Sequence, residues 1–204
     1  MFFIQKPTND QLSRFLQLQR EEPFSYAEVG ETKFGNPSGY SFGYRRLQIG
    51  QGQSDFDRAV SALRDWQMFP EHFVELIWPT DLVEGNIVAT LFRAPGFWTL
   101  NPCRMVYTVD GPLERKHRPY RAFGFAYGTV GSHLAKGEER FTVEIDSQDE
   151  TVWYEVCCFS RARHWLAKAA YPYFRLQQHR FRRLSGIAMK EFVAKPPMAM
   201  HRSS

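Results

Sequence analysis

His133, Glu138 and Glu139 are the residues whose types and spacing could support chemistry. They lie in the connection between two predicted strands, within the stretch GFAYGTVGSHLAKGEERFTVEI at residues 124–145. An imidazole close to two carboxyl groups could form an acid/base pair, or it could orient the polar group of a ligand at the mouth of a cavity. Both roles require that the three side chains face a common space.

The same three side chains also have a structural interpretation, which the sequence favours. Each glutamate could pair with a basic neighbour, Lys136 or Arg140, and His133 could cap the turn. The alternation of the second strand places Glu139 on its apolar side and Glu138 on its polar side. Glu139 is therefore the carboxyl group that is expected to border a buried face.

Three more polar side chains are candidates for contacts with a ligand. Tyr127 lies on the aromatic face of the first strand, and Tyr173 and Gln177 lie on the apolar face of the last helix. Buried polar groups need hydrogen-bond partners, which either a ligand or one another could supply. The candidate ligand-binding set is Tyr127, His133, Glu138, Glu139, Tyr173 and Gln177, and the sequence assigns no catalytic residue.

The chain shows no motif for a metal, a cofactor or a nucleophilic triad. None of its six histidines has the spacing of metal ligands, and His164 and His179 lie fifteen residues apart. Ser132 and His133 are adjacent, which is the wrong geometry for a nucleophile and its base. We therefore expect no metal and no cofactor, and the sequence favours a binding domain over an enzyme.

The strand that carries Tyr127 has two unlike faces. Between Phe123 and Val130, aromatic residues and Thr129 alternate with Gly124, Ala126, Gly128 and Val130. Small residues on one face allow a close approach of another group. The pattern predicts that the last helix packs on this small-residue face, or that the face forms one wall of a cavity.

The order of elements predicts the fold class. Helical patterns cover Asn9 to Arg20, where Asp10 could be the cap, and Ser54 to Phe69. A third helical region covers Arg161 to about Val193, where Pro172 either kinks one helix or starts a second, longer one from about Tyr171. Six strands joined by short links lie between the second and last helices, with turns predicted at Asp110-Gly111 and in the charged segment 113–121. We expect an α+β fold in which a curved antiparallel sheet of about six to seven strands grips a long C-terminal helix.

The expected domain organisation is simple. An N-terminal helical extension covers residues 1–23, a single domain covers 24–193, and 194–204 form a disordered tail. The aromatic fraction of 16% could fill a core or line a pocket for an apolar ligand. The three cysteines have no framework spacing, which indicates reduced thiols and a cytoplasmic location. No apolar run is long enough for a transmembrane helix.

Charge is distributed unevenly along the chain. Residues 155–204 contain ten Lys or Arg and two Asp or Glu, a net charge of +8. The remainder of the chain contains sixteen Lys or Arg and twenty Asp or Glu, a net charge of −4. The basic C-terminal region could contact a peripheral anionic surface, or it could be a solvated helix face. It lacks the signature of a nucleic-acid-binding module, so we do not expect nucleic acid as a partner.

Several stretches resemble the uncharacterised family called domain of unknown function nineteen-ninety. They are YAEVGET from Tyr26, IGQG from Ile49, the helix ending in Trp66, GFAYGTVGSH from Gly124, GEERF from Gly137 and FSR from Phe159. The family is similar in layout to the helix-grip proteins of the START and Bet v 1 type, which bind hydrophobic ligands. The resemblance implies a lipid-like or amphipathic small-molecule ligand in a cavity between sheet and helix. An enzyme of the cyclase or hydrolase type that uses His133 and Glu139, or a partner-binding module with a basic helix, are the alternatives.

Overall fold

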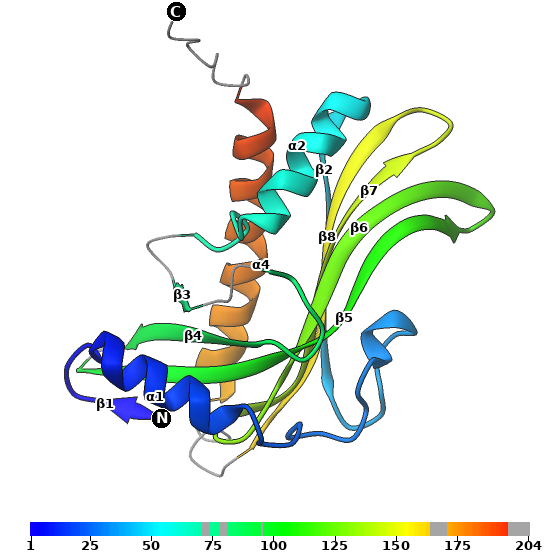
Figure 1. Ribbon diagram of the computed structural model, residues 1–204. Coiled ribbons are helices and arrows are strands. Elements are labelled where there is room, and N and C mark those ends of the chain that lie inside the picture. The colour runs from blue at the N-terminus through cyan, green and yellow to red at the C-terminus, as the bar shows by residue number, and fades with distance from the viewer. Residues whose placement is uncertain (71–73, 78–80, 95, 164–170, 196–204) are drawn as a thin grey trace, which may run out of the picture.

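The computed structural model describes residues 1–70, 74–77, 81–94, 96–163 and 171–195. One antiparallel sheet dominates the fold, with the strand order β2-β8-β7-β6-β5-β4-β3 and β1 paired to β5. The helices α2 and α4 cover one face of this curved sheet, as Figure 1 shows. The predicted α+β class, with a long C-terminal helix on an antiparallel sheet, is confirmed.

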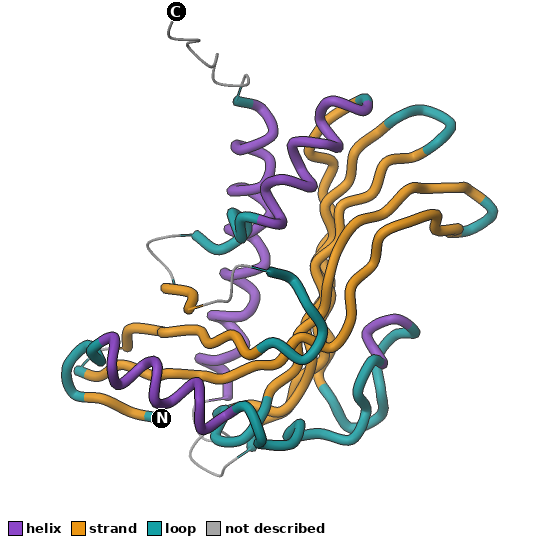
Figure 2. The backbone as a smooth tube through the Cα atoms, in the orientation of Figure 1, coloured by secondary structure: helices purple, strands orange, loops and turns teal. Residues whose placement is uncertain are grey.

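The strands are long in the centre of the sheet and short at its far edge. Their bounds are β1 Phe2–Phe3, β2 Ser41–Gln51, β3 Glu75–Ile77, β4 Ile87–Ala94, β5 Phe97–Arg115, β6 Arg118–Thr129, β7 Ala135–Asp146 and β8 Thr151–Ala162. Consecutive strands from β3 to β8 pair with each other, and β2 adds to the free edge of β8. Figure 2 shows the central strands bending away from the helices at their upper ends.

The helices follow the predicted regions but differ from them at their ends. In α1 (Asn9–Gln19) the cap is Thr8, whose side chain accepts from the backbone N–H of Gln11, and Asp10 only adds charge to the first turn. In α2 (Gln53–Arg64) the helix ends before Trp66, which takes a left-handed φ of 56°. The helical region predicted from Arg161 is wrong at its start, because β8 continues to Ala162. The helix α4 (Tyr171–Ala194) begins where the second of the two alternatives placed it.

The hairpin of β5 and β6 extends beyond its predicted length. The predicted turn at Asp110-Gly111 is wrong, because β5 continues through it to Arg115. Two consecutive left-handed residues, Lys116 and His117, make the turn instead, with φ of 50° and 63°. Positive φ at both central residues is typical of a tight hairpin turn, whose twist matches that of the strands. The predicted charged loop is therefore the tip of this hairpin.

Aromatic side chains fill the central space between the sheet and the helices. The ring centroid of Trp66 lies 4.7 Å from that of Phe125, and the centroid of Phe69 lies 5.2 Å from that of Phe181 on α4. Phe141 of β7 joins the same cluster, 5.6 Å from Phe125. Much of the aromatic excess is thus core, and any ligand space must lie beside this cluster.

The small-residue face of β6 does not receive the last helix. A Cβ on Gly128 would meet the hydroxyl group of Tyr26, and Ala126 packs with Phe24. The N-terminal segment between α1 and β2 therefore covers this face. The prediction that α4 would pack here, or that the face would line a cavity, is wrong because α4 lies on the aromatic face of the same strand.

The first residues of the chain contribute to the sheet. β1 pairs with β5, and Leu12 and Phe15 of α1 pack on Ala89 and Leu91 of β4. Residues 196–204 of the predicted disordered tail lie outside the described residues. All three cysteines are buried and free. None of the described helices combines the length and the apolar character that crossing a membrane requires.

Candidate functional site

A pocket of about 250 Å³ lies between the sheet and the first turns of α4, beside the aromatic cluster. Its wall comes from β4 to β8, from the β6–β7 turn and from α4, and most of its accessible surface is apolar. All six candidate residues border it: Tyr127, His133, Glu138, Glu139, Tyr173 and Gln177. The fold thus brings together side chains that are up to 50 residues apart in the chain.

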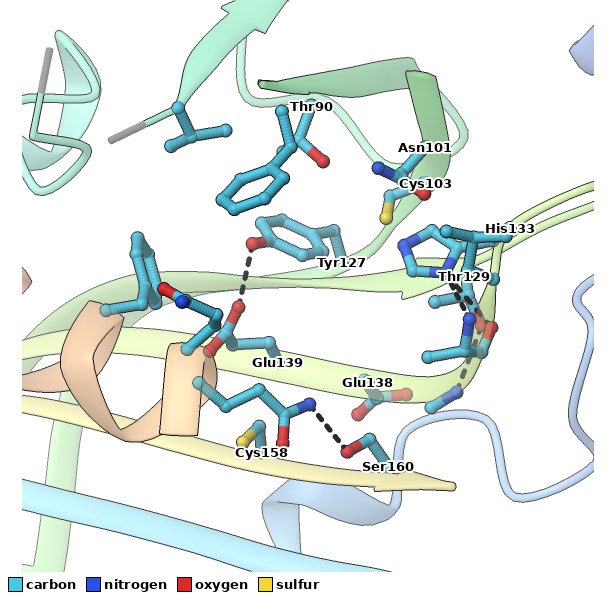
Figure 3. A pocket seen from close by; sticks show the side chains of 18 of the residues that line it. Thr90, Asn101, Cys103, Tyr127, Thr129, His133, Glu138, Glu139, Cys158 and Ser160 are labelled. Atoms are coloured by element: carbon cyan, nitrogen blue, oxygen red, sulfur yellow. Dashed lines mark hydrogen bonds between the residues drawn. The ribbon is translucent and has the colours of Figure 1, made fainter. Parts of the chain in front are cut away.

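Glu139 and Tyr127 form a polar pair in this wall. The Tyr127 hydroxyl group donates to a carboxylate oxygen of Glu139 at 2.8 Å, across the register of β6 and β7 (Figure 3). Burial raises the pKa of Glu139 to about 7, although the Tyr127 hydrogen bond and the positive charge of Arg182 lower it. Such a carboxyl group exchanges its proton near neutral pH, as a general acid or base must.

Arg182 is the positively charged residue that acts on Glu139 in this pair. It is buried on α4, and its Nη1 lies 3.5 Å from the thiol of Cys158, a residue of the pocket wall. Burial raises the pKa of Cys158 to about 12, so its thiol is neutral and acts as a packing group. The sequence reasoning missed Arg182, because the alternation of charge along α4 does not show which arginine turns inward.

His133 closes one end of the pocket. Its Nδ1 lies 2.9 Å from the backbone nitrogen and 3.0 Å from the carbonyl oxygen of Ala135. The backbone therefore occupies this nitrogen, as expected for a residue that caps the turn, and the other ring nitrogen faces the pocket (Figure 3). Burial lowers the pKa of His133 to about 4, so the ring is neutral at pH 7. In the described structure it shares no hydrogen bond with Glu139.

Glu138 borders the pocket, but its carboxylate points to the other face of the sheet. It accepts from the Tyr26 hydroxyl group at 2.8 Å, from the Gly30 N–H at 2.7 Å and from the Thr32 N–H at 3.1 Å. The Thr32 hydroxyl group donates to it as well. The expected pairing with Lys136 or Arg140 is not what the structure shows. Glu138 fixes the N-terminal segment, and its oxygens are not available to a ligand.

The opposite wall comes from α4. Tyr173, which is 45% exposed, and Gln177 border the pocket from its first turns, and Gln178 donates to the Ser160 hydroxyl group of β8 at 2.9 Å. Thr99 and Asn101 of β5 complete the wall beside β6. The sequence reasoning missed these two residues because it began the strand at Arg104, so no pattern placed them next to Tyr127.

Within the described ranges, no three His, Cys, Asp or Glu side chains are grouped as metal ligands would be.

The raised pKa of Glu139 predicts a pH-dependent difference between the wild type and Glu139→Gln. A folded-state pKa of about 7 exceeds the ordinary value of 4.5. The stabilisation from the protonated carboxyl group is therefore fully present below pH 4.5 and is lost as the pH rises towards 7. Between pH 5 and pH 8, the free energy of unfolding should fall by about 2 kcal/mol in the wild type relative to Glu139→Gln.

Urea unfolding of both proteins at several pH values measures this difference. His133 has a lowered pKa and the opposite slope, because its neutral form is favoured in the folded state. That contribution is present in both proteins and cancels in the comparison. Parallel pH profiles for the two proteins would show that Glu139 titrates at its ordinary pKa.

Comparison with known proteins places the chain in a family. The model of the family described as "Domain of unknown function (DUF1990)" matches residues 25–188. A UPF0548 protein of Dictyostelium discoideum is 30% identical over 198 residues, covering 89% of this chain and 90% of that protein. A UPF0548 protein of Deinococcus radiodurans is 34% identical over 193 residues, covering 88% of this chain and 92% of that protein.

Solved structures with a similar layout share little sequence with the chain. A START superfamily protein from Mycobacterium smegmatis has a TM-score of 0.47 and 11% identity, over 76% of this chain and 97% of its own. The Zhui aromatase/cyclase from Streptomyces sp. R1128 has a TM-score of 0.47 and 11% identity, over 76% of this chain and 93% of its own. Similarity at this level says nothing about what the chain binds. The family match and the two relatives, by contrast, each span most of the sequence, and the chain belongs to the DUF1990 family.

Proposed function

We propose that the chain binds a compact amphipathic molecule in the pocket between the sheet and α4. The observation that carries this proposal is the incomplete hydrogen bonding of the Glu139 carboxyl group. Its carboxyl group has one hydrogen-bond partner among the described residues, Tyr127, and it borders a mainly apolar pocket. A carboxyl group can accept several hydrogen bonds, and buried polar groups are normally satisfied. A ligand that donates to Glu139 would supply the missing partner.

The pocket favours a small ligand. Its volume of about 250 Å³ lies below the roughly 300–1,000 Å³ of pockets for drug-sized molecules. At about 30 Å³ per water molecule in the liquid, it corresponds to on the order of eight waters. One ring or a short branched chain with a polar end fits this space. The polar end would meet Glu139 and Tyr127, and the apolar body would lie against Phe69 and Phe181.

The other candidate residues divide by position under this proposal. Tyr173 and Gln177 would close over the ligand from α4, and His133 would offer its second ring nitrogen at the end of the pocket. Glu138 would make no direct contact, because its carboxylate serves Tyr26 and Thr32 on the other face of the sheet.

A second candidate function is proton-transfer catalysis in the same pocket. The observation that favours it is the pKa of about 7 at Glu139 in a mainly apolar environment. Glu139 would then accept or return a proton, and the neutral His133 would only donate a hydrogen bond. Turnover that follows an apparent pKa near 7 and disappears in Glu139→Gln would favour catalysis over binding alone.

Native mass spectrometry of the purified full-length chain, and titration with fluorinated phenols and anilines followed by 19F NMR, test the binding proposal. These probes combine one ring with a hydrogen-bond donor. We expect binding by the wild type, and dissociation constants roughly 10-fold to 100-fold higher for Glu139→Gln, because a hydrogen bond to a charged group contributes about 1.5–3 kcal/mol.

Two further variants show whether the probes bind in the pocket or elsewhere on the surface. Ala135→Phe places a large ring on the pocket wall and should abolish binding, whereas Ser132→Phe changes an exposed residue of the preceding β6–β7 turn, outside the pocket. Equal binding by both variants would show that the probes bind elsewhere. If no probe binds and no molecule is retained during purification, the proposal is wrong.

A further inference from the structure

A second groove lies near the pocket at the open end of the β7–β8 hairpin. It is lined by Gly39, Tyr40 and Ser41 before and at the start of β2, and by Lys136, Arg161, Ala162 and Arg163 at the ends of β7 and β8. Arg161 and Ala162 also border the ligand pocket, so the two sites are adjacent. Among the described residues, three basic residues and no acidic residue line this groove.

The register of the two strands brings like charges together. Lys136 lies directly opposite Arg161 in the β7–β8 ladder, and Arg163 follows two residues later. Like charges at directly opposed positions repel and destabilise a sheet. None of the three side chains forms a salt bridge within the described part of the chain. The fold thus holds three positively charged side chains along one groove without a salt bridge among the described residues.

Arg161 is held in a defined position within the cluster. Its guanidinium group lies over the ring of Tyr40, 4.5 Å from the centroid, and the Tyr40 hydroxyl group donates to Glu28 at 2.6 Å. Glu28 is a half-buried acidic group that acts on Arg161, but its carboxylate already accepts from Tyr40 and from the Ala27 N–H. A guanidinium group held in this way is oriented for a bidentate contact with an oxyanion.

We propose that Lys136, Arg161 and Arg163 form an anion-binding site for a phosphate group. Phosphate carries up to two negative charges and several acceptor oxygens, which match two forked guanidinium groups and one ammonium group. The phosphate belongs to a soluble phosphate ester or to the headgroup of an anionic lipid, because both present the same chemistry. The site is independent of the ligand proposed for the neighbouring pocket.

Two binding measurements on the full-length chain test the site and distinguish the sources. In the first, sodium pyrophosphate is titrated at constant ionic strength and followed by NMR. In the second, the chain is sedimented with vesicles of phosphatidylcholine, with or without 30% phosphatidic acid. Binding of pyrophosphate supports the site with a soluble phosphate, and binding only to the acidic vesicles supports it with a lipid headgroup.

Matched triple variants show whether the groove or the overall charge is responsible. The groove variant combines Lys136→Gln, Arg161→Gln and Arg163→Gln. The control combines Arg183→Gln, Lys190→Gln and Lys195→Gln, three exposed residues in or just after α4. Both remove three positive charges. We expect affinity to fall at least 10-fold in the groove variant and to change less than twofold in the control.

Measuring the stability of the variants shows whether a loss of anion binding results from unfolding. Because Lys136→Gln removes one member of a repelling pair, the unfolding midpoint of this single variant should stay equal to or above that of the wild type. Ala135→Phe, which blocks the pocket, should leave anion binding intact. Equal losses in the two triple variants, or no binding of pyrophosphate or acidic vesicles by the wild type, would overturn the proposal.

Discussion

Glu138→Ala is expected to lower the free energy of unfolding by about 3–5 kcal/mol, among the largest effects of a single substitution in this chain. The side chain is 3% exposed and accepts from Tyr26, Gly30 and Thr32. Removing it leaves buried donors without an acceptor, and each unsatisfied group costs about 1–3 kcal/mol. For a domain of this size the thermal midpoint should fall by roughly 10 °C.

Calorimetry and urea unfolding measure this effect against two controls. Tyr26→Phe removes one donor and leaves the carboxylate with its other partners, so it should cost about 1–2 kcal/mol. Glu21→Ala changes an exposed carboxylate and should stay within about 0.5 kcal/mol of the wild type. A loss from Glu138→Ala as small as that from Tyr26→Phe would mean that the N-terminal segment does not depend on this residue.

Glu155→Gln is expected to cost a similar amount, for a different reason. Glu155 is fully buried and forms salt bridges with Arg115 at 2.6 Å, Arg140 at 2.5 Å and Arg46 at 3.4 Å. Burial alone would raise the pKa of Glu155, but Arg115 and Arg140 hold it below its usual value. Neutralising the carboxylate leaves these guanidinium groups poorly compensated, and breaking a buried ion pair in this way costs about 3–5 kcal/mol.

A surface pair provides the matched control for this substitution. Lys6 and Glu75 approach to 2.6 Å, but their side chains are 52% and 43% exposed. Glu75→Gln removes the same charge and should cost less than about 1 kcal/mol. Adding 1 M NaCl to the unfolding experiment should weaken the surface effect more than the buried one, because buried pairs are screened less. Equal costs for the two substitutions would show that the Glu155 network adds nothing beyond a surface pair.

Local patterns in the sequence were sufficient for the order of most elements and for part of the site. Alternation along β7 placed Glu139 on the apolar side, and the fold puts it in the pocket wall. Helical spacing after Tyr171 placed Tyr173 and Gln177 on the face that borders the same pocket. These predictions depend only on the direction in which a side chain leaves its own strand or helix, which the periodicity of neighbouring residues fixes.

Contacts over long sequence distances could not be predicted in this way. Tyr26 and Glu138 are 112 residues apart, and no local signal indicates that one satisfies the other. The extension of β5 through Asp110 and Gly111 contradicts the local turn propensity, because pairing with β6 over the whole hairpin outweighs it. Thr99 and Asn101 could not be predicted as pocket residues, because only the pairing of β5 with β6 places them near Tyr127.

The sequence by itself determined the fold class and the face on which Glu139 lies. The fold class follows from the order of strands and helices, and the face follows from residue periodicity within one strand. Only the tertiary structure decided what those residues meet. It placed Tyr26 rather than α4 against the small-residue face of β6, and it packed aromatic rings around Trp66 between the sheet and the helices. It also brought the positive charge of Arg182 close enough to lower the pKa of Glu139. The raised pKa of Glu139 arises from that packing, since burial and charge depend on neighbours that come together only when the chain folds.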